Sequence, residues 1–268
     1  MPIQVFTGQT GIAQLKAAFK KNWKHYLQEA LGLGIFMISA CFFSAMLFSE
    51  KSSWNVSNEM MKNILMGIAM GGTALFIFYS PVTAPSGSQI NPAVTITFLR
   101  LDKMCKYDAI FFAFFQVIGG TVAVYLMQML MGSILIDTPV NSAVTVPGKT
   151  GVWSALITEF IIAFVTMTIV LFISNHDKLK KYTRIFAGCL VCTWVIVAGP
   201  VSGFGMNPAR SLASALPAKI WTAFWIYLFV PFAGMLLAAE FYLLAESKPN
   251  LKRKNAKNEL PEPLEFLL

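Results

Sequence analysis

Charged residues are scarce in this sequence. Asp, Glu, Lys and Arg make up 13% of its 268 residues, whereas hydrophobic residues make up 56%. A soluble domain carries roughly one quarter charged residues, and a mean hydropathy of +0.62 also separates this chain from that class. The shortage of charge therefore excludes an ordinary soluble domain and indicates a membrane protein.

Histidine and cysteine are also rare, with two and four residues respectively. Cys189 and Cys192 share one helical face, but they lie within an apolar run and have no second pair, so they do not form a zinc or redox motif. The sequence shows no catalytic grouping of Ser, His and Asp and no phosphate-binding glycine loop. We therefore expect no enzyme activity, no cofactor and no bound metal.

Long apolar runs, in contrast, are abundant. Six of them approach the roughly 20 residues that a helix needs to cross the hydrocarbon core of a bilayer. They are Leu27–Phe48, Ile64–Ala84, Ala109–Met131, Val152–Ser174, Ile185–Val201 and Ile220–Ala245. Two shorter segments, Pro92–Leu99 and Pro208–Leu216, are about half as long as a span requires. The sequence thus predicts an all-α membrane protein with six transmembrane helices and two re-entrant half-helices.

Each short segment begins with the tripeptide Asn-Pro-Ala. An Asn side chain caps free backbone N–H groups, and Pro fits the first helical position. The two copies are Asn91, Pro92, Ala93 and Asn207, Pro208, Ala209, and Arg210 follows the second copy. Non-helical backbone at membrane depth is tolerated only when it is buried in protein or lines a wet cavity. The loops that precede the two motifs therefore predict a water-filled path.

The two motifs indicate an internal repeat. Asn91 corresponds to Asn207, and Glu29 near the start of the first apolar run has a counterpart in Glu159 of the fourth. Three spans in each half means that the halves insert with opposite topology, as in inverted-repeat transport proteins with a midplane site. We expect one channel domain over residues 27–245, with repeat halves at about 27–132 and 152–245.

The net charge of +8 is concentrated in alternate connections between the apolar runs. This placement indicates orientation in a membrane rather than nucleic-acid binding. We expect a multi-pass protein of the cell membrane with both termini in the cytoplasm. Residues 1–26 form its N-terminal cytoplasmic segment and show no removable signal peptide. Residues 246–268 are mostly polar and proline-interrupted, which predicts a loosely ordered cytoplasmic tail.

Glu29 and Glu159 lie in apolar helices, where carboxylates are expensive enough to suggest a function. Two roles fit them. They could be proton relays of a coupled transporter, or they could accept hydrogen bonds from the backbone N–H groups of the re-entrant loops. The two glutamates are related by the same repeat as the two loops, which favours the supporting role.

The paired Asn-Pro-Ala half-helices, the Arg210 that follows, and the six-span inverted repeat resemble the major intrinsic protein family of aquaporins and aquaglyceroporins. The resemblance covers about Leu27 to Ala245. It implies a passive channel that assembles as a homotetramer in the lipid bilayer, in which the half-helix N-termini oppose cations and protons. It also implies a selectivity ring of Arg210 and three further residues, which counting from the motifs places at Gly71, Val195 and Phe204.

The residues of this ring bear on the solute. Gly71 has no side chain and Val195 cannot donate a hydrogen bond, so we expect a ring wider and less polar than a water-only filter. Phe204 resembles the aquaglyceroporin pattern, Ser211 resembles the water channels, and Gln89 stands where the family often carries His. We expect passage of water and small uncharged solutes such as glycerol, with exclusion of protons and ions. A Gly71→Phe substitution should then restrict glycerol more than water.

Two alternatives to this reading remain. The first is a water-selective aquaporin, because the markers of the two subtypes conflict. The second is a proton-coupled secondary transporter that uses Glu29 or Glu159, because such transporters share inverted repeats and broken helices. The Asn-Pro-Ala motif in both halves, together with Arg210, favours the channel over the transporter.

Overall fold

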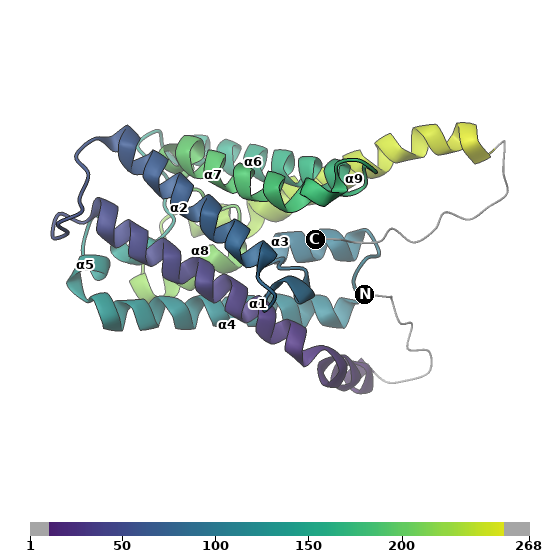
Figure 1. The fold of residues 1–268 in the computed structure, drawn as a ribbon, viewed down its shortest axis with the longest axis horizontal. Coiled ribbons are helices and arrows are strands. Elements are labelled where there is room, and N and C mark those ends of the chain that lie inside the picture. Colours follow the sequence, from purple (N-terminus) through teal and green to yellow (C-terminus); the bar gives the residue numbers. More distant parts are fainter. Residues whose placement is uncertain (1–10, 255–268) are drawn as a thin grey trace.

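The computed structural model describes residues 11–254, with side chains described up to residue 246. Every regular element in this range is a helix. Six of the helices are long and apolar enough to cross a membrane. They are α1 (Gly11–Phe48), α2 (Glu59–Tyr79), α4 (Lys106–Met131), α6 (Val152–Ser174), α7 (Thr183–Ser202) and α9 (Phe224–Lys254). Figure 1 shows that they run roughly along the long axis of the molecule.

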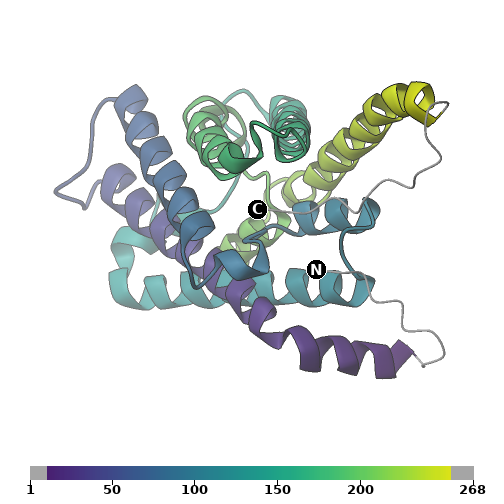
Figure 2. The ribbon, with the colours of Figure 1, turned by 45° about the vertical axis from the view of Figure 1, so that its right-hand side comes forward.

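Two short helices follow the Asn-Pro-Ala motifs. The first, α3 (Pro92–Arg100), has 9 residues, and the second, α8 (Pro208–Ala218), has 11, so neither can span a membrane. Each of them contacts both α4 and α9, which are the last long helices of the two halves. The half-helices therefore lie inside the bundle, between elements of both repeats (Figure 2).

The packing of the long helices repeats between the halves. Helix α1 packs along α4 in the first half, α6 packs along α9 in the second, and α2 packs against α7 across the halves. Repeat-related glycines allow the first two contacts. A Cβ at Gly119 would overlap the carbonyl oxygen of Ala30, and a Cβ at Gly234 would lie 2.8 Å from the carbonyl oxygen of Phe160. Small residues permit such close helix approach in membranes.

The N-terminal boundary expected at residue 26 is not a structural break, because α1 is continuous from Gly11. Side chains on this early part of α1 fix it to the start of α4. Asn22 donates from Nδ2 to Oδ1 of Asp108 at 2.9 Å, and the Tyr26 hydroxyl donates to the same oxygen at 2.5 Å. The first turns of α1 thus belong to the folded domain rather than to a separate segment.

Two other boundaries also differ from the expectation. Helix α2 ends at Tyr79 rather than near Ala84, because Ser80 adopts an extended backbone before Pro81, which cannot continue a helix. Helix α9 continues to Lys254, so the first part of the expected tail at 246–268 is helical, and residues 255–268 lie outside the described range. Short turns complete the chain: η1 (Ala84–Ser86), α5 (Ser133–Ile136), η2 (Asn141–Ala143) and η3 (Lys180–Tyr182).

Candidate functional site

The two half-helices begin at the motif asparagines in the same way. Asn91 has an extended backbone, and its Oδ1 accepts a hydrogen bond from the Ala93 N–H at 2.9 Å. Oδ1 of Asn207 accepts from the N–H groups of Ala209 at 3.0 Å and Arg210 at 3.2 Å. In each motif the proline occupies the first helical position. The amide oxygens are thereby used as caps, and the amide nitrogens remain for other partners.

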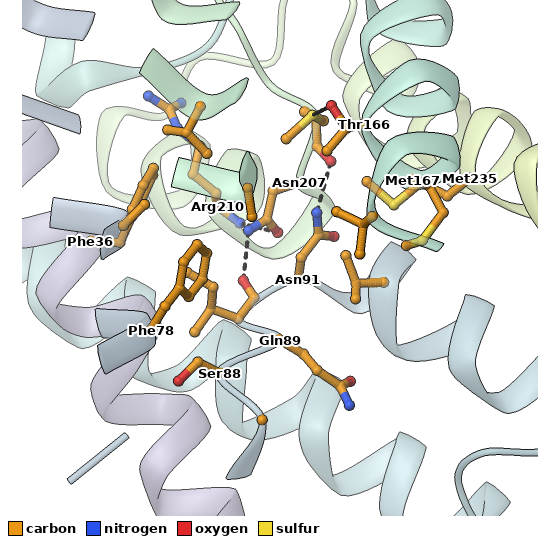
Figure 3. Close-up of a pocket in the computed structure, with 18 of the residues that line it drawn as sticks. Phe36, Phe78, Ser88, Gln89, Asn91, Thr166, Met167, Asn207, Arg210 and Met235 are labelled. Atoms are coloured by element: carbon orange, nitrogen blue, oxygen red, sulfur yellow. Dashed lines mark hydrogen bonds between the residues drawn. The ribbon is translucent and has the colours of Figure 1, made fainter. Parts of the chain in front are cut away.

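The amide nitrogens join the two motifs across the repeat. Nδ2 of Asn91 donates to the carbonyl oxygen of Met206 at 3.0 Å, and Nδ2 of Asn207 donates to the carbonyl oxygen of Ile90 at 2.6 Å (Figure 3). Each nitrogen carries two hydrogens and uses one of them in this bond. The N-termini of α3 and α8 therefore meet, and each asparagine nitrogen has a second hydrogen that no described residue accepts.

The loops that lead into the motifs carry an unusual backbone. Ser88 and Ile90 have φ values of 46° and 43°, and the corresponding residues of the second half, Phe204 and Met206, have 50° and 47°. This left-handed region costs a non-glycine residue about 1–3 kcal/mol. The conformation persists because a glutamate holds the N–H groups of each loop.

Glu29 supports the first loop. Its Oε1 accepts from the Ser86 hydroxyl at 2.6 Å and the Gln89 N–H at 2.9 Å. Its Oε2 accepts from the Ile90 N–H at 2.6 Å and from Nε2 of Gln116 at 2.8 Å. The residue is completely buried, so these four donors take the place of water around the carboxylate.

Glu159 supports the second loop with one donor fewer. Its Oε1 accepts from the Ser202 hydroxyl at 2.6 Å and the Gly205 N–H at 2.8 Å, and its Oε2 accepts from the Met206 N–H at 2.5 Å. The repeat explains the difference, because the position that corresponds to Gln116 is Pro231, which has no side-chain donor. Glu159 is also completely buried.

A cavity with a volume of about 110 Å³ lies where the two loops meet. A single water needs roughly 10–15 Å³ on this measure, so the cavity has room for several. Both motif asparagines, both loops and Arg210 line it, and Phe36, Phe78, Met167, Val191 and Met235 give it an apolar side. Figure 3 shows several of these side chains around Asn91 and Asn207. Among its described lining residues two are cationic, Arg184 and Arg210, and none is acidic.

The structure brings together part of the expected selectivity ring. Arg210 and Phe204 both line the cavity, and each is 8% exposed. Nη1 of Arg210 donates to the hydroxyl oxygen of Thr145, which lies in the connection between η2 and α6. Val195 is buried one helical turn beyond Val191, and Val191 lines the cavity.

Gly71 does not line the cavity and lies instead at the contact between α2 and α7. A Cβ at this position would lie 2.6 Å from Cβ of Cys192 and 3.0 Å from the carbonyl oxygen of Gly188, both on α7. Gly71 thus serves the close contact between α2 and α7. The cavity-facing residues of α2 are Ala74 and Phe78. A shift of one residue along a helix turns a side chain by about 100°. The segment 80–91 between α2 and the first motif is largely irregular, so the distance in sequence from Asn91 does not determine which face of α2 a residue occupies.

Several site residues were not identified from the sequence. Phe36 and Ala74 lie in apolar helices without a motif, and nothing in their spacing separates pore-facing from lipid-facing residues. Thr145 lies in a connection of ordinary composition and is separated from Arg210 by 65 positions. Only the tertiary structure could bring Thr145 to Arg210.

Comparisons with known proteins agree with this architecture. The family model for major intrinsic proteins matches residues 16–242. Aquaporin NIP1-4 of Oryza sativa subsp. japonica is 32% identical over 67% of this chain and 64% of its own length. Aquaporin NIP1-2 of Arabidopsis thaliana is 33% identical over 66% of this chain and 62% of its own length. The chain therefore matches less than two thirds of the length of either relative.

The fold also matches a solved structure. The X-ray structure of the aquaglyceroporin from Plasmodium falciparum superposes with a TM-score of 0.68 at 20% sequence identity, covering 82% of this chain and 95% of that one. At this identity the likeness concerns the fold alone. The family match extends over most of the sequence and includes both half-helices, and the chain therefore belongs to the major intrinsic protein family.

Proposed function

We propose that this protein is a passive membrane channel for water and small uncharged solutes such as glycerol, and that it excludes protons and ions. The observation that carries this proposal is the cavity at the meeting point of the two half-helices, where Asn91 and Asn207 each keep an amide hydrogen. A channel, rather than an enzyme, is also consistent with membership of the family.

Charge exclusion follows from the elements around the cavity. Each half-helix N-terminus contributes roughly half a positive charge, and both point toward the junction of the motifs. Arg210 adds a full positive charge and lines the same cavity. A cation or a hydrated proton entering this space meets a positive potential and no acidic lining side chain. A neutral molecule carries no such penalty.

The composition of the walls supports solutes with a carbon backbone. Phe36, Phe78 and Val191 supply apolar surface, while Asn91, Asn207 and Arg210 supply donors. A polyol presents hydrogen-bonding oxygens and apolar C–H groups at once. It therefore fits a cavity with both kinds of wall better than it would fit a purely polar channel. This is the reason for preferring water plus small uncharged solutes over water alone.

Proton-coupled transport draws no support from the two glutamates. Glu29 and Glu159 do not line the cavity, and their carboxylate oxygens accept hydrogen bonds from four and three groups respectively. A relay has to exchange its proton with the pathway. Glu29 and Glu159 are instead bonded to the loops, which fits a role in supporting the loop backbone.

Purified protein in liposomes tests the proposal directly. After a hyperosmotic step with glycerol, stopped-flow light scattering should show rapid shrinkage from water efflux and then reswelling from glycerol entry that does not saturate. A proton gradient should not alter the glycerol rate. Protein-free liposomes are the control. Water flux without reswelling would indicate a water-selective aquaporin, and saturable uptake driven by the gradient would indicate a transporter.

Assembly and location complete the proposal. We propose a homotetramer in the cell membrane with both termini in the cytoplasm, on the basis of the family and the distribution of basic residues. Native mass spectrometry of the detergent-solubilised protein should give four times the 29.6 kDa chain mass. Protease accessibility of an N-terminal tag in intact cells and in inverted vesicles would determine the orientation.

A further inference from the structure

Gln89, two residues before Asn91, is one of the residues that line the cavity. Its Oε1 accepts a hydrogen bond from the Thr95 hydroxyl at 2.7 Å. Its Nε2 donates to no group among the described residues and is not enclosed by protein. In Figure 3 Gln89 and Arg210 lie on opposite sides of the paired asparagines. One end of the amide is therefore fixed, and the donor end is available.

A chain of hydrogen bonds sets this orientation. Nε2 of Gln116 donates to Oε2 of Glu29 at 2.8 Å and also lies 3.3 Å from Oγ1 of Thr95. Because a carboxylate accepts and an amide nitrogen donates, Glu29 determines which end of Gln116 faces Thr95. The Thr95 hydroxyl accepts from Gln116 and has one hydrogen to give, and Oε1 of Gln89 at 2.7 Å is a closer acceptor than the carbonyl oxygen of Asn91 at 3.2 Å. Glu29 thus determines, through two side chains, that Oε1 of Gln89 is bonded to Thr95, while Nε2 donates to no group among the described residues.

The second half of the repeat lacks this arrangement. Gly205 corresponds to Gln89 and has no side chain, and Pro231 corresponds to Gln116 and has no donor. Ser211 corresponds to Thr95, and its buried hydroxyl oxygen has no hydrogen-bond partner. The oriented side-chain amide of Gln89 therefore occurs in the first half only. The internal repeat does not explain its presence, because the second half folds in the same way without it.

We propose that Nε2 of Gln89 is a binding subsite for the oxygen atoms of neutral, hydroxyl-bearing solutes such as polyols, and that Thr95 and Gln116 are its positioning residues. The proposal rests on the channel function proposed above. Together with Arg210 and the two asparagines, Gln89 extends the series of donors from one side of the motif junction to the other. A solute hydroxyl can then exchange one donor for the next as it moves.

Three substitutions and one control substitution test the subsite by the ratio of glycerol to water permeability in liposomes. Gln89→Met removes the donor at similar length, and Gln89→Glu keeps the shape and the oxygen that accepts from Thr95 but also lacks the donor. Thr95→Val releases the amide, whereas Thr95→Ser retains the hydroxyl. We expect the ratio to fall about threefold to tenfold in the first three variants, the range for one net hydrogen bond. The Thr95→Ser variant should keep the wild-type ratio.

Non-additivity identifies Thr95 as a positioning residue. The Gln89→Met, Thr95→Val double variant should show the same ratio as Gln89→Met alone, because Thr95 acts only through Gln89. Size-exclusion chromatography and thermal melting of each variant establish folding. An unchanged ratio in a folded Gln89→Met or Gln89→Glu protein would overturn the subsite, and an additive double variant would overturn the positioning role.

Solid-state NMR separates this inference from the channel proposal. The side-chain ¹⁵N signal of Gln89 should shift when glycerol is added, and the shift should disappear in Thr95→Val. If the wild-type protein passes no glycerol, the proposed solute range fails, yet the NMR signal still decides the subsite. No shift with glycerol would overturn it.

Discussion

Asn207 and Ile90 join the two halves of the protein, because the Asn207 amide donates to the Ile90 carbonyl oxygen at 2.6 Å. Asn91 makes the reciprocal bond to Met206. The groups that are proposed to face the solute are thus the same groups that hold the half-helices together. Changes at the motif should therefore affect stability and selectivity at once.

Asn207→Asp separates the two functions of this side chain. The carboxylate can still cap Ala209 and Arg210, but it cannot donate to Ile90 and places negative charge at the junction. We expect a loss of about 1–3 kcal/mol in the free energy of unfolding and a measurable cation leak. Thermal unfolding in detergent and fluorescent-dye flux assays in liposomes check these two effects. An unchanged leak would contradict the electrostatic role of the junction.

Glu29→Gln and Glu159→Gln should lower stability unequally. In each variant the nitrogen of the new amide replaces one carboxylate oxygen, so the N–H and O–H groups that donated to that oxygen lose their acceptor. A buried hydrogen bond that is left unmade costs about 1–3 kcal/mol. Glu29 accepts from four donors and Glu159 from three, so we expect the larger loss in Glu29→Gln. Unfolding midpoints of the two variants in one detergent measure this. Wild-type midpoints together with altered proton coupling would instead indicate a relay.

Gly71→Phe should disrupt helix packing rather than change the selectivity of the channel. A Cβ at Gly71 already lies 2.6 Å from Cβ of Cys192, so any side chain forces α2 away from α7. We expect a lower yield of folded protein and equal loss of water and glycerol flux. Gly72→Ala is the matched control, since no atom lies within 4 Å of its Cβ. A folded Gly71→Phe protein with a selective loss of glycerol flux would return Gly71 to the ring.

Arg210→Val and Thr145→Val separate the charge of Arg210 from its position. The first removes the guanidinium charge from the cavity, so cation exclusion should weaken. The second keeps the charge but removes the partner of Nη1, so we expect cation exclusion to persist while the ratio of glycerol to water permeability changes. Ion flux and swelling in the same liposomes measure both. Equal ion leak in the two variants would contradict this separation.

The sequence by itself determined the local structure of the site. Six apolar runs predicted the long helices, and the six candidate spans confirm them. Asn91 and Asn207 marked the starts of the half-helices because capping and proline placement depend on residues adjacent in the chain. Their places in the first and fourth apolar runs also paired Glu29 with Glu159, and the structure shows that both accept hydrogen bonds from the loops.

Only the tertiary structure decided which side chains meet at the junction. The rotation of α2 relative to the cavity excludes Gly71 and admits Ala74 and Phe78. Thr145 reaches Arg210, and Gln89 is oriented through Thr95, Gln116 and Glu29. Apolar helices look alike on every face, and hydrogen bonds between distant segments leave no periodic pattern, so these relationships arise only when the helices pack.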